Sequence, residues 1–250
     1  MITGITGIDN LGEQALAKMA QMALSNQLNE AEQLKILVKT DPGKLAQGEL
    51  EWLEIDGKGL VMRESLRMQE MELKINDIAV CPIKALMGNI ELTKPIEGTA
   101  RIVVTQEDIN YAFNSELLAN QMRDLNIQAD GKVVKMGIER VTCQLLANGT
   151  VEIDADILLQ QTGETQQVSF TTTPDISTDG RTVMLKEVQY VEGKELSPEI
   201  TSILLQKAKA ILNLRNFEMQ GISLCIHQLE VTEGLLTLQA AANVTKFPST

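Results

Sequence analysis

The sequence is poor in the residues from which catalytic and metal sites are most often built. It contains one histidine, His227, and three widely separated cysteines, Cys81, Cys143 and Cys225. A single histidine excludes a two-histidine metal site and a relay between imidazoles, and a zinc cluster needs more closely spaced thiols. We therefore expect no catalytic site, no metal site and no cofactor. We expect the cysteines to be buried or half-buried free thiols, as in a reducing cytosol.

Basic surface and long apolar runs are scarce as well. The 250 residues carry 22 Lys or Arg against 34 Asp or Glu, a net charge of −12. This balance repels a phosphate backbone, so nucleic acid is not an expected partner. No apolar run approaches the ~20 residues of a spanning helix, and the first ten residues lack a secretory signal pattern. We expect a cytoplasmic protein, whose contact with a membrane would need apolar insertion or a local basic patch.

Aromatic residues make up only 3% of the chain, whereas methionine occurs 11 times. The core must therefore be built mainly from Leu, Ile, Val and Met. Because methionine is flexible and fills irregular gaps, this composition suits both a loose core and an adaptable binding surface.

Apolar residues at helical spacing predict helices over about 11–24, 106–122 and 198–212. Thr105 and Ser197 are the predicted caps of the second and third helices, and Pro198 stands at a favoured first position. The predicted apolar face of the first helix holds Leu11, Ala15, Met19, Met22 and Ala23. That of the third holds Ile200, Ile203, Leu204, Ala208, Ile211 and Leu212.

Between these segments the apolar residues recur with a period of two, which is typical of strands. The clearest strand spans 150–160, with Val151 to Leu159 alternating against acidic residues. Turns at Asn148-Gly149, Asp179-Gly180 and Glu233-Gly234 predict antiparallel neighbours. Gly57-Lys58-Gly59-Leu60 is predicted to be a tight turn into a strand.

The chain shows no regular strand–helix–strand alternation, which disfavours a parallel sheet. We expect an α+β fold in which one extended antiparallel sheet lays its dry face against amphipathic helices. We expect a single domain over residues 1–250, ordered from about 10 to 245. Helices that cover such a face completely make an ordinary core, whereas partial cover leaves a groove that an acyl chain can fill.

A few polar clusters have chemical alternatives. Asp154 and Asp156 share one strand face, which fits an acid–base pair or a cation site, but their alternation with apolar residues favours a solvated face. Cys225 and His227 also share a strand face, which fits thiolate activation or an unreactive surface pair. Trp52, the single tryptophan, fits a sheet end or a membrane interface.

Several segments, taken in order, resemble one known family. They are Thr40-Asp41-Pro42-Gly43-Lys44-Leu45-Ala46-Gln47-Gly48, Cys81-Pro82-Ile83-Lys84-Ala85-Leu86, and a strand that runs into Thr105-Gln106-Glu107-Asp108-Ile109-Asn110. The succession resembles the LmeA-like phospholipid-binding family over about residues 10–245. The resemblance implies a tubular-lipid-binding type of fold, with a curved antiparallel sheet around a long helix, an apolar groove for acyl chains and no enzyme activity. Actinobacterial members are typically exported, whereas this sequence points to the cytosolic face of a membrane.

Three functions follow as hypotheses. The first is non-catalytic binding of phospholipid or another acyl lipid, for lipid transfer or membrane maintenance, with a peripheral membrane position. Its candidate lining residues are Met62, Met68, Leu204 and Ile211, each of which also suits an ordinary core. The second is a fully packed interaction or scaffold domain without a groove. The third is an enzyme with an unrecognised site, which would need a deep pocket with strongly perturbed acids.

Overall fold

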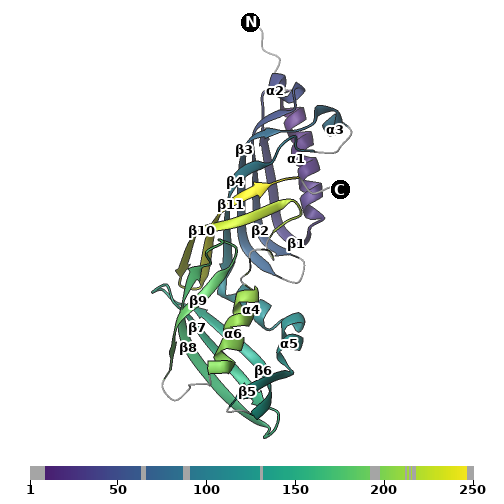
Figure 1. Ribbon diagram of the computed structural model, residues 1–250. Coiled ribbons are helices and arrows are strands. Elements are labelled where there is room, and N and C mark those ends of the chain that lie inside the picture. Colours follow the sequence, from purple (N-terminus) through teal and green to yellow (C-terminus); the bar gives the residue numbers. More distant parts are fainter. Residues whose placement is uncertain are drawn as a thin grey trace.

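The computed structural model describes residues 9–62, 66–86, 91–129, 132–191, 198–211, 213, 215 and 218–246. Two antiparallel sheets follow one another along an elongated molecule, and each has helices on one side (Figure 1). The protein is mostly β-structure with few helices. Buried apolar side chains of both sheets belong to one contiguous core. The expected single domain over residues 1–250 stays a prediction.

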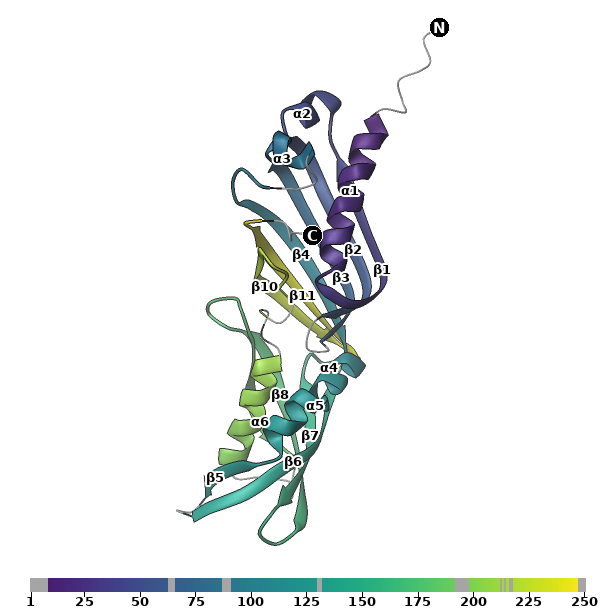
Figure 2. The same cartoon turned by 90° about the vertical axis from the view of Figure 1, so that its right-hand side faces the viewer.

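The first sheet is a curled half-barrel with the strand order β1-β2-β3-β4-β11-β10. Its strands are β1 (Leu28–Lys39), β2 (Glu49–Met62), β3 (Arg67–Ala79), β4 (Ile96–Thr105), β10 (Ile222–Thr232) and β11 (Leu235–Val244). Helix α1 (Asp9–Ser25) lies along β1 in both views, and the short helices α2 (Pro42–Ala46) and α3 (Pro82–Leu86) lie at the end of the sheet far from the second sheet (Figures 1 and 2).

The second sheet has the order β5-β6-β7-β8-β9. Its strands are β5 (Leu125–Ala129), β6 (Lys132–Leu145), β7 (Val151–Leu159), β8 (Glu164–Ile176) and β9 (Val183–Tyr190). Helices α4 (Gln106–Phe113), α5 (Glu116–Met122) and α6 (Pro198–Ile211) lie on one side of it (Figure 2). The strand predicted over 150–160 is confirmed as β7, in which Val151, Ile153, Ala155 and Ile157 are buried and the acids are half-buried.

Antiparallel pairing is confirmed, but the prediction of one extended sheet is wrong. Both sides of β4 are occupied, since it pairs with β3 and with β11. The second side of β4 is taken by β11 and not by the next strand in sequence, and the chain between them builds the second sheet. Leu235 lies opposite Thr105, a pairing between distant segments that no local pattern announces.

The prediction of a turn at 57–60 is also wrong, because β2 runs through these residues. Gly57 pairs with Leu34 and Leu60 pairs with Ala31 without a change of register. Gly59 has a positive φ of 55°, and a Cβ there would lie 2.4 Å from Cδ of Glu32. Glycine thus serves a left-handed position under a neighbouring side chain, within a strand rather than between two.

The helix predicted over 106–122 is two helices, α4 and α5, that meet at Asn114 and Ser115. Thr105 is confirmed as the cap of α4, and it forms a capping box with Asp108. The break has a tertiary cause, because the Asn114 amide binds the backbone of Val141 on β6. Its Nδ2 donates to the Val141 carbonyl at 2.8 Å, and its Oδ1 accepts from the Val141 N–H at 3.2 Å.

Two further amides of α4 repeat this contact one turn apart. Asn110 accepts a hydrogen bond from the Cys143 N–H at 2.6 Å and donates to its carbonyl at 3.0 Å. Gln106 accepts from the Leu145 N–H at 2.9 Å. Three side chains at helical spacing thus satisfy alternate residues of β6 along the side that β7 leaves open. This amide ladder joins the end of β4 in the first sheet to β6 in the second.

Candidate functional site

The inner face of the half-barrel carries apolar rows that cross all six strands. Residues directly opposite one another in the pairing register point to the same side of a sheet. One row joins Ile36, Ile55, Leu73, Ala100, Ala240 and Ile226, and all six are buried. The next row joins Val38, Leu53, Ile75, Gly98, Ala242 and Leu224. The face is therefore apolar without interruption from β1 to β10.

Side-chain size changes along these rows. The strands β1, β2 and β3 contribute Ile, Leu and Val, whereas β4 and β11 contribute only Gly or Ala to the same rows. Small side chains make the face lower at β4 and β11 than beside them, so a neighbouring group can approach the backbone more closely there. The low region is limited to these two rows, because the next row on the same face pairs Leu238 with Ile102, which are both buried.

Helix α1 covers this face beside β1. The β1 side chains Ile36 and Val38 are buried, whereas Lys35 and Lys39 on the other side of the strand are exposed. The buried apolar side chains of α1 are two leucines and two alanines, namely Leu16, Ala20, Ala23 and Leu24. The predicted face of α1 is correct for Ala23, which is buried, and for the half-buried Met19, but wrong for Leu11, Ala15 and Met22, which are exposed. Two apolar stripes overlap on this helix, and contact with β1 selects one of them.

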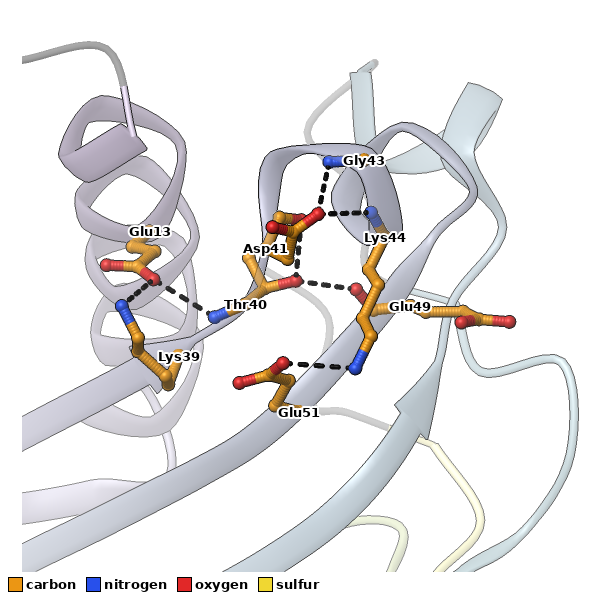
Figure 3. Close-up of polar contacts among 8 residues, drawn as sticks. All are labelled: Glu13, Lys39, Thr40, Asp41, Gly43, Lys44, Glu49 and Glu51. Carbon is orange, nitrogen blue, oxygen red and sulfur yellow. Dashed lines mark hydrogen bonds and ion pairs between the residues drawn. The ribbon is translucent and has the colours of Figure 1, made fainter. Parts of the chain in front are cut away.

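A polar clasp fastens the first turns of α1 to the end of β1 (Figure 3). Glu13 is only 9% exposed, and its Oε1 accepts a hydrogen bond from the Thr40 backbone N–H at 3.0 Å. The same oxygen lies 3.3 Å from Nζ of Lys39. The Thr40 hydrogen bond is the main cause that lowers the pKa of Glu13, with a smaller contribution from Lys39. Farther along the helix, Gln21 donates to the Leu34 carbonyl at 2.9 Å.

The turn that follows the clasp is held by its own sequence. Asp41 caps α2 by accepting from the backbone N–H groups of Gly43 and Lys44, and Pro42 stands in the first turn. The hydroxyl of Thr40 donates to the Glu49 carbonyl at 2.8 Å, and Lys44 pairs with Glu51 at 3.0 Å (Figure 3). The segment from Thr40 to Lys44 therefore has a structural role, since it fixes the Thr40 N–H that Glu13 binds.

The model of the LmeA-like phospholipid-binding family matches residues 7–241 of this chain. The chain belongs to the LmeA-like phospholipid-binding family. No curated protein matches it. A crystal structure of lipopolysaccharide binding protein covers 96% of this chain and 97% of its own at 11% identity, with a TM-score of 0.18. A TM-score this low carries no argument about the fold, so a tubular-lipid-binding architecture stays a prediction.

The four lining residues predicted for a lipid groove divide between two places. Leu60 pairs with Met68, and Met62 follows two residues later, so Met62 and Met68 share one side of the first sheet. Both are buried. They do not continue the two apolar rows, because the alternation of buried and exposed residues along β2 shifts by one residue at Gly59. Leu204 is buried on α6, which covers the second sheet. Ile211 ends α6, and its side chain lies outside the described residues.

The polar clusters of this LmeA-like protein lie away from the apolar rows. Asp154 and Asp156 are half-buried beside Arg140 and line an open pocket of about 330 Å³ on β6, β7 and β8. His227 and Cys225 are both exposed on β10, so the expectation that all three thiols are buried or half-buried is wrong for Cys225. Within the described part of the chain, no helix is both long and apolar enough to cross a membrane.

Sequence patterns missed the clasp itself. An acid in the first turn of a helix, such as Glu13, needs no further partner, so its position in the sequence indicates no tertiary contact. The Asp41-Pro42 pair signals a helix start, and this signal marks the end of β1 that Glu13 reaches. A partner 27 residues away in the chain has no local signature.

Proposed function

We propose that this protein binds phospholipid without catalysis, and that the acyl chains lie on the apolar rows of the half-barrel beside or beneath α1. The observation that carries the proposal is an uninterrupted apolar face, low at β4 and β11, whose cover along β1 is one helix with a small apolar contact. Membership of a family named for phospholipid binding supports it.

The energies favour an exchange between helix and lipid. Burial of Leu16 and Leu24 stabilises the closed position of α1 by about 3–6 kcal/mol, and the two alanines add little. An acyl chain of about sixteen carbons gains roughly 12 kcal/mol when its methylenes leave water, at about 0.8 kcal/mol each. Part of this gain offsets the ordering of the chain. Relative to a lipid monomer in water, a lipid can therefore replace the apolar contacts of α1 with a net gain.

The predicted lining residues mark two alternative positions for the lipid. Met62 and Met68 mark the end of the first sheet that faces α4, and their flexible side chains adapt to a ligand. Leu204 and Ile211 mark a second candidate position under α6. We propose the first sheet as the main site, because its apolar rows are continuous and its cover is thin.

Photo-crosslinking tests the position. A phosphatidylcholine with a diazirine in its acyl chain is bound, irradiated and mapped by mass spectrometry at residue level. We expect labels on inward residues such as Ile55, Leu73 and Ala240, and on Leu24 of α1. Trp52 faces the opposite side from the buried Leu53 and serves as an internal negative control. Labels confined to Trp52 and other outward residues, or none at stoichiometric lipid, contradict the proposal.

One observation favours the alternative of a packed interaction domain. Met62, Met68 and Leu204 are already buried without a ligand, as an ordinary core requires. The same crosslinking preparation decides between the two functions through native mass spectrometry. A stoichiometric co-purified lipid supports the binding protein. Protein that stays free of lipid after incubation with vesicles supports the interaction domain.

We further propose that the protein acts in the cytoplasm, in lipid transfer or membrane maintenance, with a peripheral position on the cytosolic face of a membrane. Its three cysteines are free thiols, which suits a reducing compartment. Fractionation of cells that express a tagged chain tests the compartment, since recovery in an extracytoplasmic fraction would contradict it.

A further inference from the structure

The most exposed large aliphatic side chains gather at one end of the molecule. Among the described residues, Ile83 on α3 is 71% exposed and Leu11 in the first turn of α1 is 64% exposed. Both views place the start of α1, together with α2 and α3, at the end of the half-barrel away from the second sheet (Figures 1 and 2). Other exposed large apolar side chains are Leu37 near the end of β1, and Met22, Tyr111, Val133, Val191 and Leu235 on other parts of the chain.

The three helices at this end support one another. A Cβ at Gly12 of α1 would lie 2.7 Å from Cδ2 of Leu45 on α2. A Cβ at Gly48, just after α2, would lie 2.8 Å from Cγ of Pro82 on α3. These close approaches connect α1 to α2 and α2 to α3. Leu11 and Ile83 therefore project from a packed rim, so little ordering cost accompanies their contact with a partner.

Three lysines at this end each have an acidic partner, in the pairs Lys39–Glu13, Lys44–Glu51 and Lys84–Glu91. Acids outnumber lysines at this end, because Asp41 and Glu49 also lie near Lys44, so contact with a bilayer must come from apolar insertion rather than from attraction to anionic lipid. The whole chain carries −12. A 14-residue strand such as β2 is roughly 46 Å long, several times the Debye length of about 8 Å at physiological salt. Acidic groups of the second sheet are therefore screened from a surface that touches this end.

We propose that this end, formed by the first turn of α1 with α2 and α3, is a membrane-docking surface. Leu11 and Ile83 enter the interfacial region of a phospholipid bilayer, while the lysine–glutamate pairs stay in the headgroup layer. The inference rests on the proposed phospholipid binding and adds where the lipid enters. Because the Glu13–Thr40 clasp lies at the same end, docking brings the fastening of α1 next to the lipid source.

The test compares two double variants of the full chain that match in charge and exposure. Leu11→Glu with Ile83→Glu alters the docking surface. Met22→Glu with Val133→Glu alters side chains that are 57% and 55% exposed on the last turns of α1 and on β6. Circular dichroism and urea unfolding verify that both variants fold. Flotation with phosphatidylcholine vesicles reports docking, and extraction of a fluorescent phosphatidylcholine from these vesicles reports transfer.

A third measurement separates the docking surface from the lipid site. A short-chain fluorescent phosphatidylcholine, used below its micelle concentration, reaches the site without a bilayer. We expect the Leu11/Ile83 variant to bind this monomeric lipid like the wild type. We expect its flotation and extraction to fall about tenfold or more, because two aliphatic side chains no longer insert. The Met22/Val133 variant keeps all three properties.

Each other outcome decides one of the two proposals. Equal flotation and extraction by both variants overturns the docking surface while lipid binding stands. A wild type that binds no monomeric lipid overturns the proposed function, and flotation alone then decides the docking surface. A wild type that does not float overturns the bilayer as the occupant and favours a protein partner at this end.

Discussion

The Glu13 carboxylate on α1 accepts a hydrogen bond from the backbone N–H of Thr40, at 3.0 Å, where β1 ends. Thr40 itself is buried, and Lys39 approaches the same carboxylate oxygen at 3.3 Å. This contact joins the helix that covers the apolar rows to the end of the sheet it covers. Changes at Glu13 should therefore alter both stability and the release of α1.

Replacement of Glu13 by alanine should lower the free energy of unfolding by about 1–3 kcal/mol, because the buried Thr40 N–H loses its acceptor. The rate of uptake of monomeric lipid should rise, since α1 loses one of its fastenings. Urea unfolding and stopped-flow fluorescence measure the two effects. The neighbouring Gln14 is exposed, so Gln14→Ala is the control and should change neither. Unchanged uptake in Glu13→Ala would show that α1 does not move when lipid enters.

The stability difference between the wild type and Glu13→Gln should depend on pH. The Thr40 hydrogen bond lowers the pKa of Glu13 in the folded state below its ordinary value. The ionised form therefore adds stability that is complete above the unfolded carboxyl pKa of about 4.3 and is lost as pH falls through the lowered folded value. Urea unfolding should give a constant difference from pH 7 to about 5 and a shrinking one below it. A difference that does not change with pH would contradict an ionised clasp.

Asn110→Ala should be strongly destabilising for a polar substitution. It removes the donor and the acceptor that satisfy the buried backbone of Cys143 on β6, so a loss of about 1–3 kcal/mol or more is expected. Asn110→Asp keeps the acceptor but sets a carboxylate oxygen against the Cys143 carbonyl, so it should also be destabilising. Glu107→Gln, on an exposed position of α4, is the control. Equal stabilities for all three variants would show that the amide ladder contributes nothing to the joint between the sheets.

Thiol reactivity should follow burial. Burial raises the pKa of Cys143 to about 12, so the native protein at pH 8 holds almost no thiolate there. Cys225 is exposed and should react quickly with iodoacetamide. Mass spectrometry of native and urea-unfolded samples should show labelling of Cys143 only after unfolding. In Asn110→Ala this labelling should begin at a lower urea concentration. Fast labelling of native Cys143 would contradict a closed α4–β6 contact.

Local patterns were sufficient for several elements. Alternation from Val151 to Leu159 predicted β7, because a strand with one buried face imposes a period of two. Thr105 predicted the start of α4, because a cap residue and the backbone N–H that it binds lie within one turn. The turns predicted at Gly149, Gly180 and Gly234 are confirmed. Each of these glycines has a positive φ, which is the conformation that favours glycine.

The sequence by itself determined a β-rich chain with antiparallel strands, apolar strand faces and its phospholipid-binding family, because these depend on composition, short-range periodicity and ordered motifs. Only the tertiary structure decided that the strands form two sheets, which stripe of α1 is buried, and that Glu13 meets Thr40. Each of these depends on a choice among competing partners far apart in the chain. Such a choice is made by packing and by the satisfaction of buried polar groups, which leave no local signature.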